Sequence, residues 1–183
     1  MTTSGGTSNF GVLFEYDPAT GVYTKKLDFD GAANGRYPYG SLAPGGSGKL
    51  YGMTYSGGTS YFGVLFEYDP ATGVYTKKHD FEGAANGRYP RGSLALGGNG
   101  KLYGMTNQGG TFYSGVLFEY DPATGGYTKK LDFDGAANGS YPFSSLAASG
   151  NGKLYGMTIS GGTSNSGVLF EYYPATGVYT KKI

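Results

Sequence analysis

The chain repeats itself every 52 residues, and this period limits its possible folds more than any other feature of the sequence. The segment Gly11-Val-Leu-Phe-Glu-Tyr-Asp-Pro-Ala-Thr-Gly21 returns at residues 63–73, 115–125 and 167–177. A fixed period of this kind marks an architecture in which each repeat is one supersecondary unit that buries its apolar surface against the next. The sequence therefore predicts an array of similar units.

Each repeat is predicted to hold four strands. Residues 63–69 alternate two sets of side chains with the two-residue period of a strand, and residues 49–54 and 74–81 have the composition of strands. The run of small residues at 37–43 is expected to form the innermost strand. Turns are predicted at 44–48 and at the Asp-Pro-Ala-Thr-Gly motif, since Pro and Gly favour the backbone angles that turns need. No stretch has the 3.6-residue apolar period of a helix.

Four short antiparallel strands in about 50 residues match one blade of a β-propeller. The predicted fold is therefore all-β, with a partial blade at 1–30 made of third and outer strands, blades at 37–82 and 89–134, and a blade at 141–183 with a truncated outer strand. Propellers close with about four to eight blades. About 3.5 blades are thus expected to form an open arc or part of a larger propeller, and the open ends make self-association possible.

Three features with a fixed spacing within the repeat carry a family resemblance: Leu50-Tyr51-Gly52, the pair Gly57-Gly58, and Phe66. With them the whole chain resembles the bacterial repeat family named for Gloeobacter and Verrucomicrobia. It is also similar to kelch repeats in its Gly-Gly pair and its Tyr-Asp-Pro run, although Tyr75 stands in the region of the kelch tryptophan. The resemblance implies a propeller-like fold and a surface location, and it implies no reaction.

Charge and composition exclude several classes of function. The chain has 14 basic and 13 acidic residues, so a net charge of +1 gives no electrostatic basis for binding nucleic acid or an anionic membrane. No apolar run approaches the ~20 residues of a membrane-spanning helix. The absence of cysteine removes disulfides and thiol catalysis. The first residues already belong to the repeat and form no signal peptide, yet an exported or cell-surface protein is favoured.

Two features of the sequence resemble chemical sites. Asp28, Asp30 and Asn34 are spaced like ligands in a calcium loop, but a polar turn after a strand explains them more simply. His79 is the only histidine, and it replaces a leucine of other repeats, which favours a packing role over a catalytic one. We therefore expect no catalytic residue, no metal site and no cofactor.

The copies differ from one another mainly in two places, the loop between the second and third strands and the approach to the inner strand. In a four-stranded meander these two connections lie on the same rim of the blade. Loops on a rigid scaffold often carry binding residues, although neutral drift in exposed loops would produce the same pattern. The predicted binding residues are Arg36, Tyr39, Tyr55, Tyr61, Arg88, Arg91, Asn107, Gln108, Phe112, Tyr113 and Phe143.

The function predicted from these observations is a non-enzymatic repeat scaffold that presents a variable loop rim to a protein or a carbohydrate. Two alternatives stay open at this point. The chain would also suit a fragment of a larger propeller enzyme acting on polysaccharide, with its active residues in other blades. It would equally suit a purely structural or engineered repeat protein.

Overall fold

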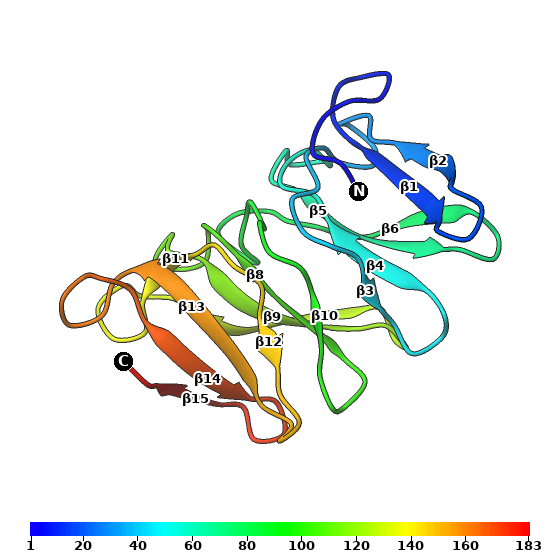
Figure 1. The fold of residues 1–183 in the computed structure, drawn as a ribbon. Coiled ribbons are helices and arrows are strands. Elements are labelled where there is room, and N and C mark those ends of the chain that lie inside the picture. The colour runs from blue at the N-terminus through cyan, green and yellow to red at the C-terminus, as the bar shows by residue number, and fades with distance from the viewer.

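All regular structure in the chain is β-sheet. The computed structural model describes residues 1–183 and arranges 15 strands in antiparallel sheets that follow one another along a curved array (Figure 1). The first and last sheets lie at opposite ends of this array, which is open (Figure 1). No helix has the length and hydrophobicity that crossing a bilayer requires. The prediction of an all-β fold of four-stranded propeller blades, in an open arc or as part of a larger propeller, is confirmed.

We number the four sheets as blades 1 to 4 in chain order. Blade 1 has only two strands, β1 (Val12–Asp17) and β2 (Val22–Asp28). Blade 2 has the order β3 (Ala43–Pro44), β4 (Leu50–Met53), β5 (Val64–Asp69) and β6 (Val74–Asp80). Blade 3 repeats it with β7 (Ala95–Leu96), β8 (Leu102–Thr106), β9 (Val116–Asp121) and β10 (Gly126–Asp132). Blade 4 has β12 (Ala147–Ala148), β13 (Leu154–Ser160), β14 (Leu169–Tyr173) and β15 (Val178–Lys181), and β11 (Ser140–Pro142) also pairs with β13.

The innermost strand is much shorter than the sequence predicts. In blade 2 only Ala43 and Pro44 pair with β4, so the prediction of a strand over 37–43 and a turn beginning at Pro44 was wrong. Tyr37 has a left-handed backbone with φ of 59°, which turns the chain away from the sheet. Ser41 donates its backbone N–H to the Ser93 side chain of the next blade instead of to β4. The segment before β3 therefore bonds between blades.

The hydrophobic core is divided among the junctions between neighbouring blades. Leu65 on β5 packs with Phe118 of blade 3, whereas the adjacent Phe66 packs with Phe29 of blade 1. The two-residue period of β5 places these side chains on opposite faces, as predicted. Each complete junction also holds a pair of tyrosines, such as Tyr51 and Tyr120, whose ring centroids are 5.9 Å apart. Every inner blade is therefore buried on both faces.

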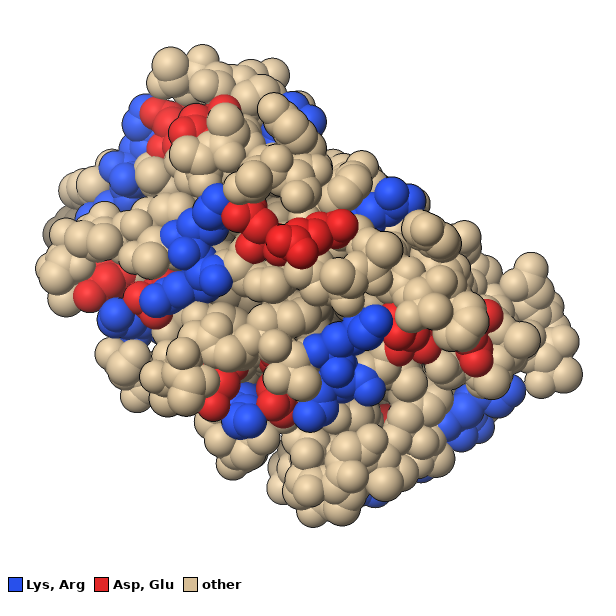
Figure 2. Space-filling model, turned by 180° about the vertical axis from the view of Figure 1, so that it is seen from behind, with Lys and Arg blue, Asp and Glu red and all other residues tan.

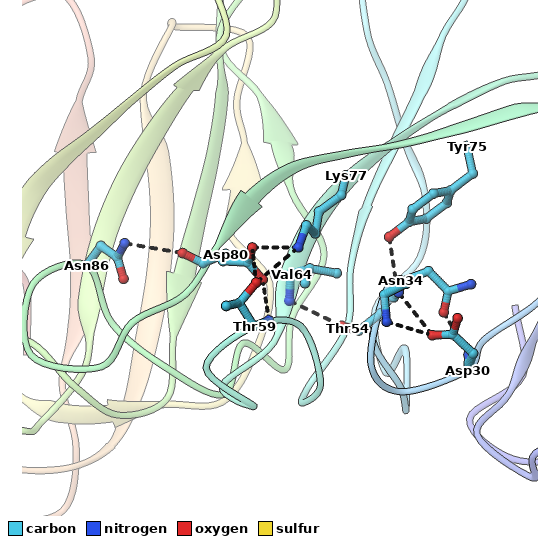
Figure 3. Close-up of polar contacts among 10 residues, drawn as sticks. Asp30, Asn34, Thr54, Thr59, Val64, Tyr75, Lys77, Asp80 and Asn86 are labelled. Atoms are coloured by element: carbon cyan, nitrogen blue, oxygen red, sulfur yellow. Dashed lines mark hydrogen bonds and ion pairs between the residues drawn. The ribbon is translucent and has the colours of Figure 1, made fainter.

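Repeated polar contacts tie each outer strand to the connection that precedes its blade. The Tyr75 hydroxyl of β6 donates to the Asn34 carbonyl of the preceding connection at 2.9 Å (Figure 3). The same bond recurs from Tyr127 to Asn86 at 2.6 Å and from Tyr179 to Asn138 at 2.8 Å. Each bond holds the outer strand of one blade against the connection from the preceding blade, and both partners are buried or half-buried.

A buried carboxylate joins three strands within each complete blade. Glu67 on β5 accepts hydrogen bonds from Lys49 at 2.8 Å and from the Tyr51 hydroxyl at 2.6 Å, and Lys78 of β6 lies 3.3 Å away. Burial alone would raise the pKa of Glu67, but these three donors outweigh it and hold the pKa below its usual value.

Figure 2 shows positive and negative side chains interspersed across the rear of the molecule.

Candidate functional site

The two variable segments of each blade lie against one another at one rim. Arg36 and Ser56 exchange backbone hydrogen bonds of 2.7 and 3.2 Å, and Arg88 and Gln108 form the same bridge in the next blade. We call this edge the loop rim and define it by residues 30–42 and 54–62 with their equivalents 52 and 104 residues later. The opposite edge, with residues 17–21 and 45–48 and their equivalents, is the turn rim.

Arg91 stands at the centre of the loop rim, between aromatic rings from two neighbouring blades. Its guanidinium carbon is 4.5 Å from the Tyr55 ring centroid, 4.5 Å from that of Phe143 and 5.3 Å from that of Tyr39. A guanidinium within about 6 Å of a ring centroid is attracted to the ring face. The same repeat position in successive blades holds Tyr39, Arg91 and Phe143. Because a cation stands between two aromatic residues in this series, the three side chains form an aromatic–cation–aromatic contact.

The stack continues beyond Arg91 along the rim. Tyr55 is stacked on Tyr89 with ring centroids 5.0 Å apart and an angle of 23°, and Tyr89 meets Phe62 edge-on at 5.5 Å. Arg88 lies 5.5 Å from both of those rings. We call this set the aromatic ridge: Tyr39, Tyr55, Phe62, Arg88, Tyr89, Arg91 and Phe143. Its rings and guanidinium groups form one chain of contacts from blade 2 to blade 4.

The arginines differ from the lysines in their interaction partners. Ten of the eleven lysines form ion pairs with Asp or Glu, whereas Arg36, Arg88 and Arg91 form none. The Nε atoms of Arg88 and Arg91 are buried without a hydrogen-bond partner. Aromatic faces, rather than carboxylates, therefore hold these two cations in place.

The tips of two loops expose tyrosines on an unfavourable backbone. Tyr61 is 64% exposed with φ of 62°, and Tyr113 is 60% exposed with φ of 56°. The equivalent residues in the other two copies are Asn9 and Asn165, and each accepts a hydrogen bond from the backbone of its own loop at 2.9 Å. Asparagine tolerates the left-handed region, but an aromatic residue there is strained. Neither tyrosine gains burial that would offset this strain.

The remaining predicted binding residues have different surroundings. Phe112 is 57% exposed beside Tyr113. Asn107 is buried and donates from its side-chain amide to the Pro142 carbonyl of the next blade at 3.2 Å, so it links two blades. Gln108 uses its backbone to pair with Arg88. Sequence reasoning missed Phe62 and Tyr89, although the change from Phe10 and Phe62 to serine at 114 and 166 was a usable signal.

The acidic pattern that resembles a calcium loop is used in two separate hydrogen-bonded loops. The Asp30 carboxylate accepts from the backbone N–H groups of Ala33 and Asn34, both at 3.0 Å, and Asn34 accepts from the Asp30 N–H at 2.7 Å (Figure 3). Asp80 accepts from the N–H and hydroxyl of Thr59 and pairs with Lys77 at 2.6 Å (Figure 3). No group of three or more His, Asp or Glu side chains is placed to hold a metal ion.

His79 lies at the junction of blades 2 and 3. Its ring is stacked on Tyr127 with centroids 4.0 Å apart and an angle of 5°, and its Nε2 is 2.9 Å from the Asn86 side-chain nitrogen. Burial lowers the pKa of His79, against the smaller opposite effects of Glu82 and Asp80. The packing role predicted for this residue agrees with these contacts.

The repeat, the blade geometry and the sequence together define a propeller-repeat protein. The whole chain, residues 1–183, matches the Gloeobacter/Verrucomicrobia repeat, and the protein belongs to that family. A comparison with curated proteins found no match.

Several solved structures share the fold at low sequence identity. The extracellular domain of the putative hybrid two component system BT4673 from B. thetaiotaomicron has a TM-score of 0.63 at 19% identity, with 96% of this chain and 20% of that one covered. PorZ, a bacterial surface component of the type-IX secretion system of Porphyromonas gingivalis, has a TM-score of 0.58 at 18% identity, covering 93% and 23%. TolB from Acinetobacter baumannii has a TM-score of 0.55 at 11% identity, covering 93% and 37%. The chain thus spans a fifth to about a third of these proteins, and the likeness concerns the fold alone.

Proposed function

We propose that this protein is a non-catalytic scaffold whose loop rim binds carbohydrate. The observation that carries the proposal is the aromatic ridge centred on Arg91. Ring faces provide flat apolar platforms for the C–H faces of sugar rings, and guanidinium groups without carboxylate partners provide donors for hydroxyl or acidic substituents. Tyr39 and Phe143, both 49% exposed, form the accessible parts of this surface.

The exposed tips of the loops extend this surface outward. Tyr61 and Tyr113 stand on the same rim as the ridge and keep their rings in solvent at the cost of backbone strain. Strained backbone positions cluster at active sites, ligand clamps and switch regions, which makes these two tyrosines candidates for ligand contact. A long surface that combines a ridge with projecting tyrosines suits an extended ligand such as a polysaccharide.

The non-catalytic part of the proposal is supported by the surroundings of the side chains that could act as acids or bases. The buried glutamates Glu67, Glu119 and Glu171 accept hydrogen bonds from Lys and Tyr donors of their own blade. His79 is enclosed between Tyr127 and Asn86. An exported or cell-surface location is part of the same proposal, in keeping with the extracellular and surface proteins that share the fold.

The proposal is tested by screening the protein on a glycan array and then measuring affinity for the best ligand. We expect Arg91→Ala, Tyr61→Ala and Tyr113→Ala each to weaken binding by about tenfold or more, as for aromatic and arginine anchors elsewhere. Val74→Ala, at an exposed apolar position beside the turn rim, is the matched control and should bind normally. Binding that none of the three rim substitutions changes, or a rim that binds a protein and no glycan, would overturn the carbohydrate assignment.

A further inference from the structure

Arg88 and Arg91 lie on the approach to the inner strand of blade 3, which has a neighbouring blade on each side. Aromatic rings of the ridge hold both guanidinium groups, with ring centroids between 4.5 and 5.5 Å from the guanidinium carbons. A ring that covers the face of a guanidinium leaves the N–H donors at the edges of its plane. Each of the two side chains is therefore held as a flat fork of donors.

The donors of these two forks are unused within the protein. The Nε atoms of Arg88 and Arg91 are buried without a partner, and their terminal nitrogens are not enclosed and form no hydrogen bond or ion pair with a protein group. Arg36, the equivalent of Arg88 one blade earlier, donates from its Nε to the Ser56 hydroxyl at 3.0 Å. Gln108 replaces that serine opposite Arg88. Blade 3 is the one blade of the chain with an arginine at both positions.

The carboxylates of the loop rim do not neutralise the two arginines. Asp30 and Asp134 accept hydrogen bonds from the backbone of their own loops at 3.0 Å. Asp80 pairs with Lys77 at 2.6 Å. Glu82 is exposed and pairs with neither arginine. Two fixed cations therefore remain beside aromatic platforms, and this combination is complementary to an anionic group carried by a sugar ring.

We propose that the carbohydrate bound at the loop rim is a polymer of uronic acid, whose carboxylate groups are bound by Arg88 and Arg91. This inference rests on the proposed function and names its class of ligand. A carboxylate is planar and offers two oxygens, which match the two parallel donors of a guanidinium fork. The stacked rings of Tyr55 and Tyr89, with centroids 5.0 Å apart, lie between the two arginines. A chain with repeated carboxylates can therefore reach both forks and pack a sugar face on the rings between them.

The test compares polygalacturonate with its fully methyl-esterified form, because esterification removes the charge and keeps the sugar chain. In calcium-free buffer, calorimetry should show that the wild type binds the acidic form about a hundredfold more tightly, since each charged contact contributes about tenfold. Arg88→Gln and Arg91→Gln should each lower this preference about tenfold and leave affinity for the ester within about twofold, which also shows that the variants are folded. Lys78→Gln removes the same charge from strand β6, and its partner Glu67 keeps Lys49, so this control should retain the preference.

The other results overturn the inference in separate ways. Equal affinity for the acidic and esterified chains, or binding of neutral glycans without polygalacturonate or alginate, would remove the uronic acid and leave carbohydrate binding intact. Tighter binding of dextran sulfate than of either polyuronate would show that the site is not built for a carboxylate. A loss of preference in Lys78→Gln equal to that in the arginine variants would assign the effect to net charge. Binding of no carbohydrate at all would remove the proposed function and this inference together.

Discussion

The two rims of the array are made by the same strands, yet they are held by different means. On the turn rim, the Asp69 carboxylate accepts from the Ala71 N–H at 2.9 Å and Gly73 adopts a φ of 73°, with the same arrangement at Asp17 and Asp121. On the loop rim, aromatic and arginine side chains contact one another across blades. Local turn chemistry therefore closes the turn rim, whereas contacts between repeats form the aromatic ridge of the loop rim.

One copy shows which part of the turn chemistry is essential. Tyr173 replaces the turn aspartate in blade 4, and the side-chain cap is lost there. The Gly177 N–H still donates to the Tyr173 carbonyl at 2.8 Å, as in the other turns. Pro and Gly therefore maintain the turn when the cap is absent. The aromatic ridge of the loop rim has no such local alternative, since its contacts depend on which residues adjacent blades carry.

The largest expected effect lies between the rims, where the blades bury their faces. Phe118 is fully buried, so Phe118→Ala should lower the free energy of unfolding by about 3–5 kcal/mol. Phe14 is the equivalent residue in blade 1 and is half-exposed, so Phe14→Ala should cost only about 1–2 kcal/mol. Denaturant unfolding of both variants checks this ratio. Equal losses would mean that blade 1 is as well packed as the inner blades.

The next largest effect concerns the buried carboxylate. Glu119→Ala leaves the Tyr103 hydroxyl and Lys101 without their acceptor, and we expect a loss of about 2–3 kcal/mol in unfolding free energy at neutral pH. The matched change Glu15→Ala removes an exposed ion pair with Lys26 and should cost at most about 0.5 kcal/mol.

The loss caused by Glu119→Ala has a predicted pH dependence. Burial alone would raise the pKa of Glu119, but hydrogen bonds from Tyr103 and Lys101 hold the pKa below its usual value. A lowered folded-state pKa gives stability that is present above the unfolded value of 4.5 and is lost as pH falls through the folded value. As pH falls, the difference in unfolding free energy between Glu119→Ala and the wild type should therefore become smaller. A gap that stays constant with pH would contradict this account.

A smaller effect on the unfolding free energy, in this case an increase, is expected at the loop rim. Tyr61→Asn and Tyr113→Asn place the residue of the other two copies on the left-handed backbone and restore its bond to the loop. We expect each substitution to raise the unfolding free energy by about 1 kcal/mol. The reverse changes, Asn9→Tyr and Asn165→Tyr, should lower it by a similar amount. Thermal unfolding of the four variants measures both directions, and a destabilising Tyr61→Asn would show that the ring makes an unrecognised contact.

The smallest effect is a change, caused by substituting His79, in how steeply the unfolding free energy depends on pH. Because burial lowers the pKa of His79, the neutral ring contributes stability above the unfolded value of 6.5 and loses it as pH falls through the folded value. His79→Leu, the residue at positions 27 and 131, should remove that part of the slope between about pH 7 and pH 5. Denaturant midpoints of the wild type and the variant, measured across this pH range, test the prediction. The charged neighbours Asp80 and Glu82 remain in the variant, so an unchanged slope would assign it to them.

The period and the strand alternation were predictable because they are local. The two-residue pattern of 64–69 correctly placed Leu65 and Phe66 on opposite faces. The short inner strand was not predictable, since the bond from Ser41 to Ser93 joins residues in different blades. The same reason hid the aromatic ridge. Its residues were largely identified as variable positions, but the contact of Arg91 with Tyr39 and Phe143 depends on the geometry between blades.

The central claim is that the loop rim keeps its tyrosines for binding at the expense of stability. The most direct test is to measure glycan affinity and unfolding free energy together for the double variant Tyr61→Asn/Tyr113→Asn, beside the wild type and Val74→Ala. We predict a double variant that is more stable than the wild type and binds the glycan at least about tenfold more weakly. A double variant that is more stable and binds with unchanged affinity would contradict the claim.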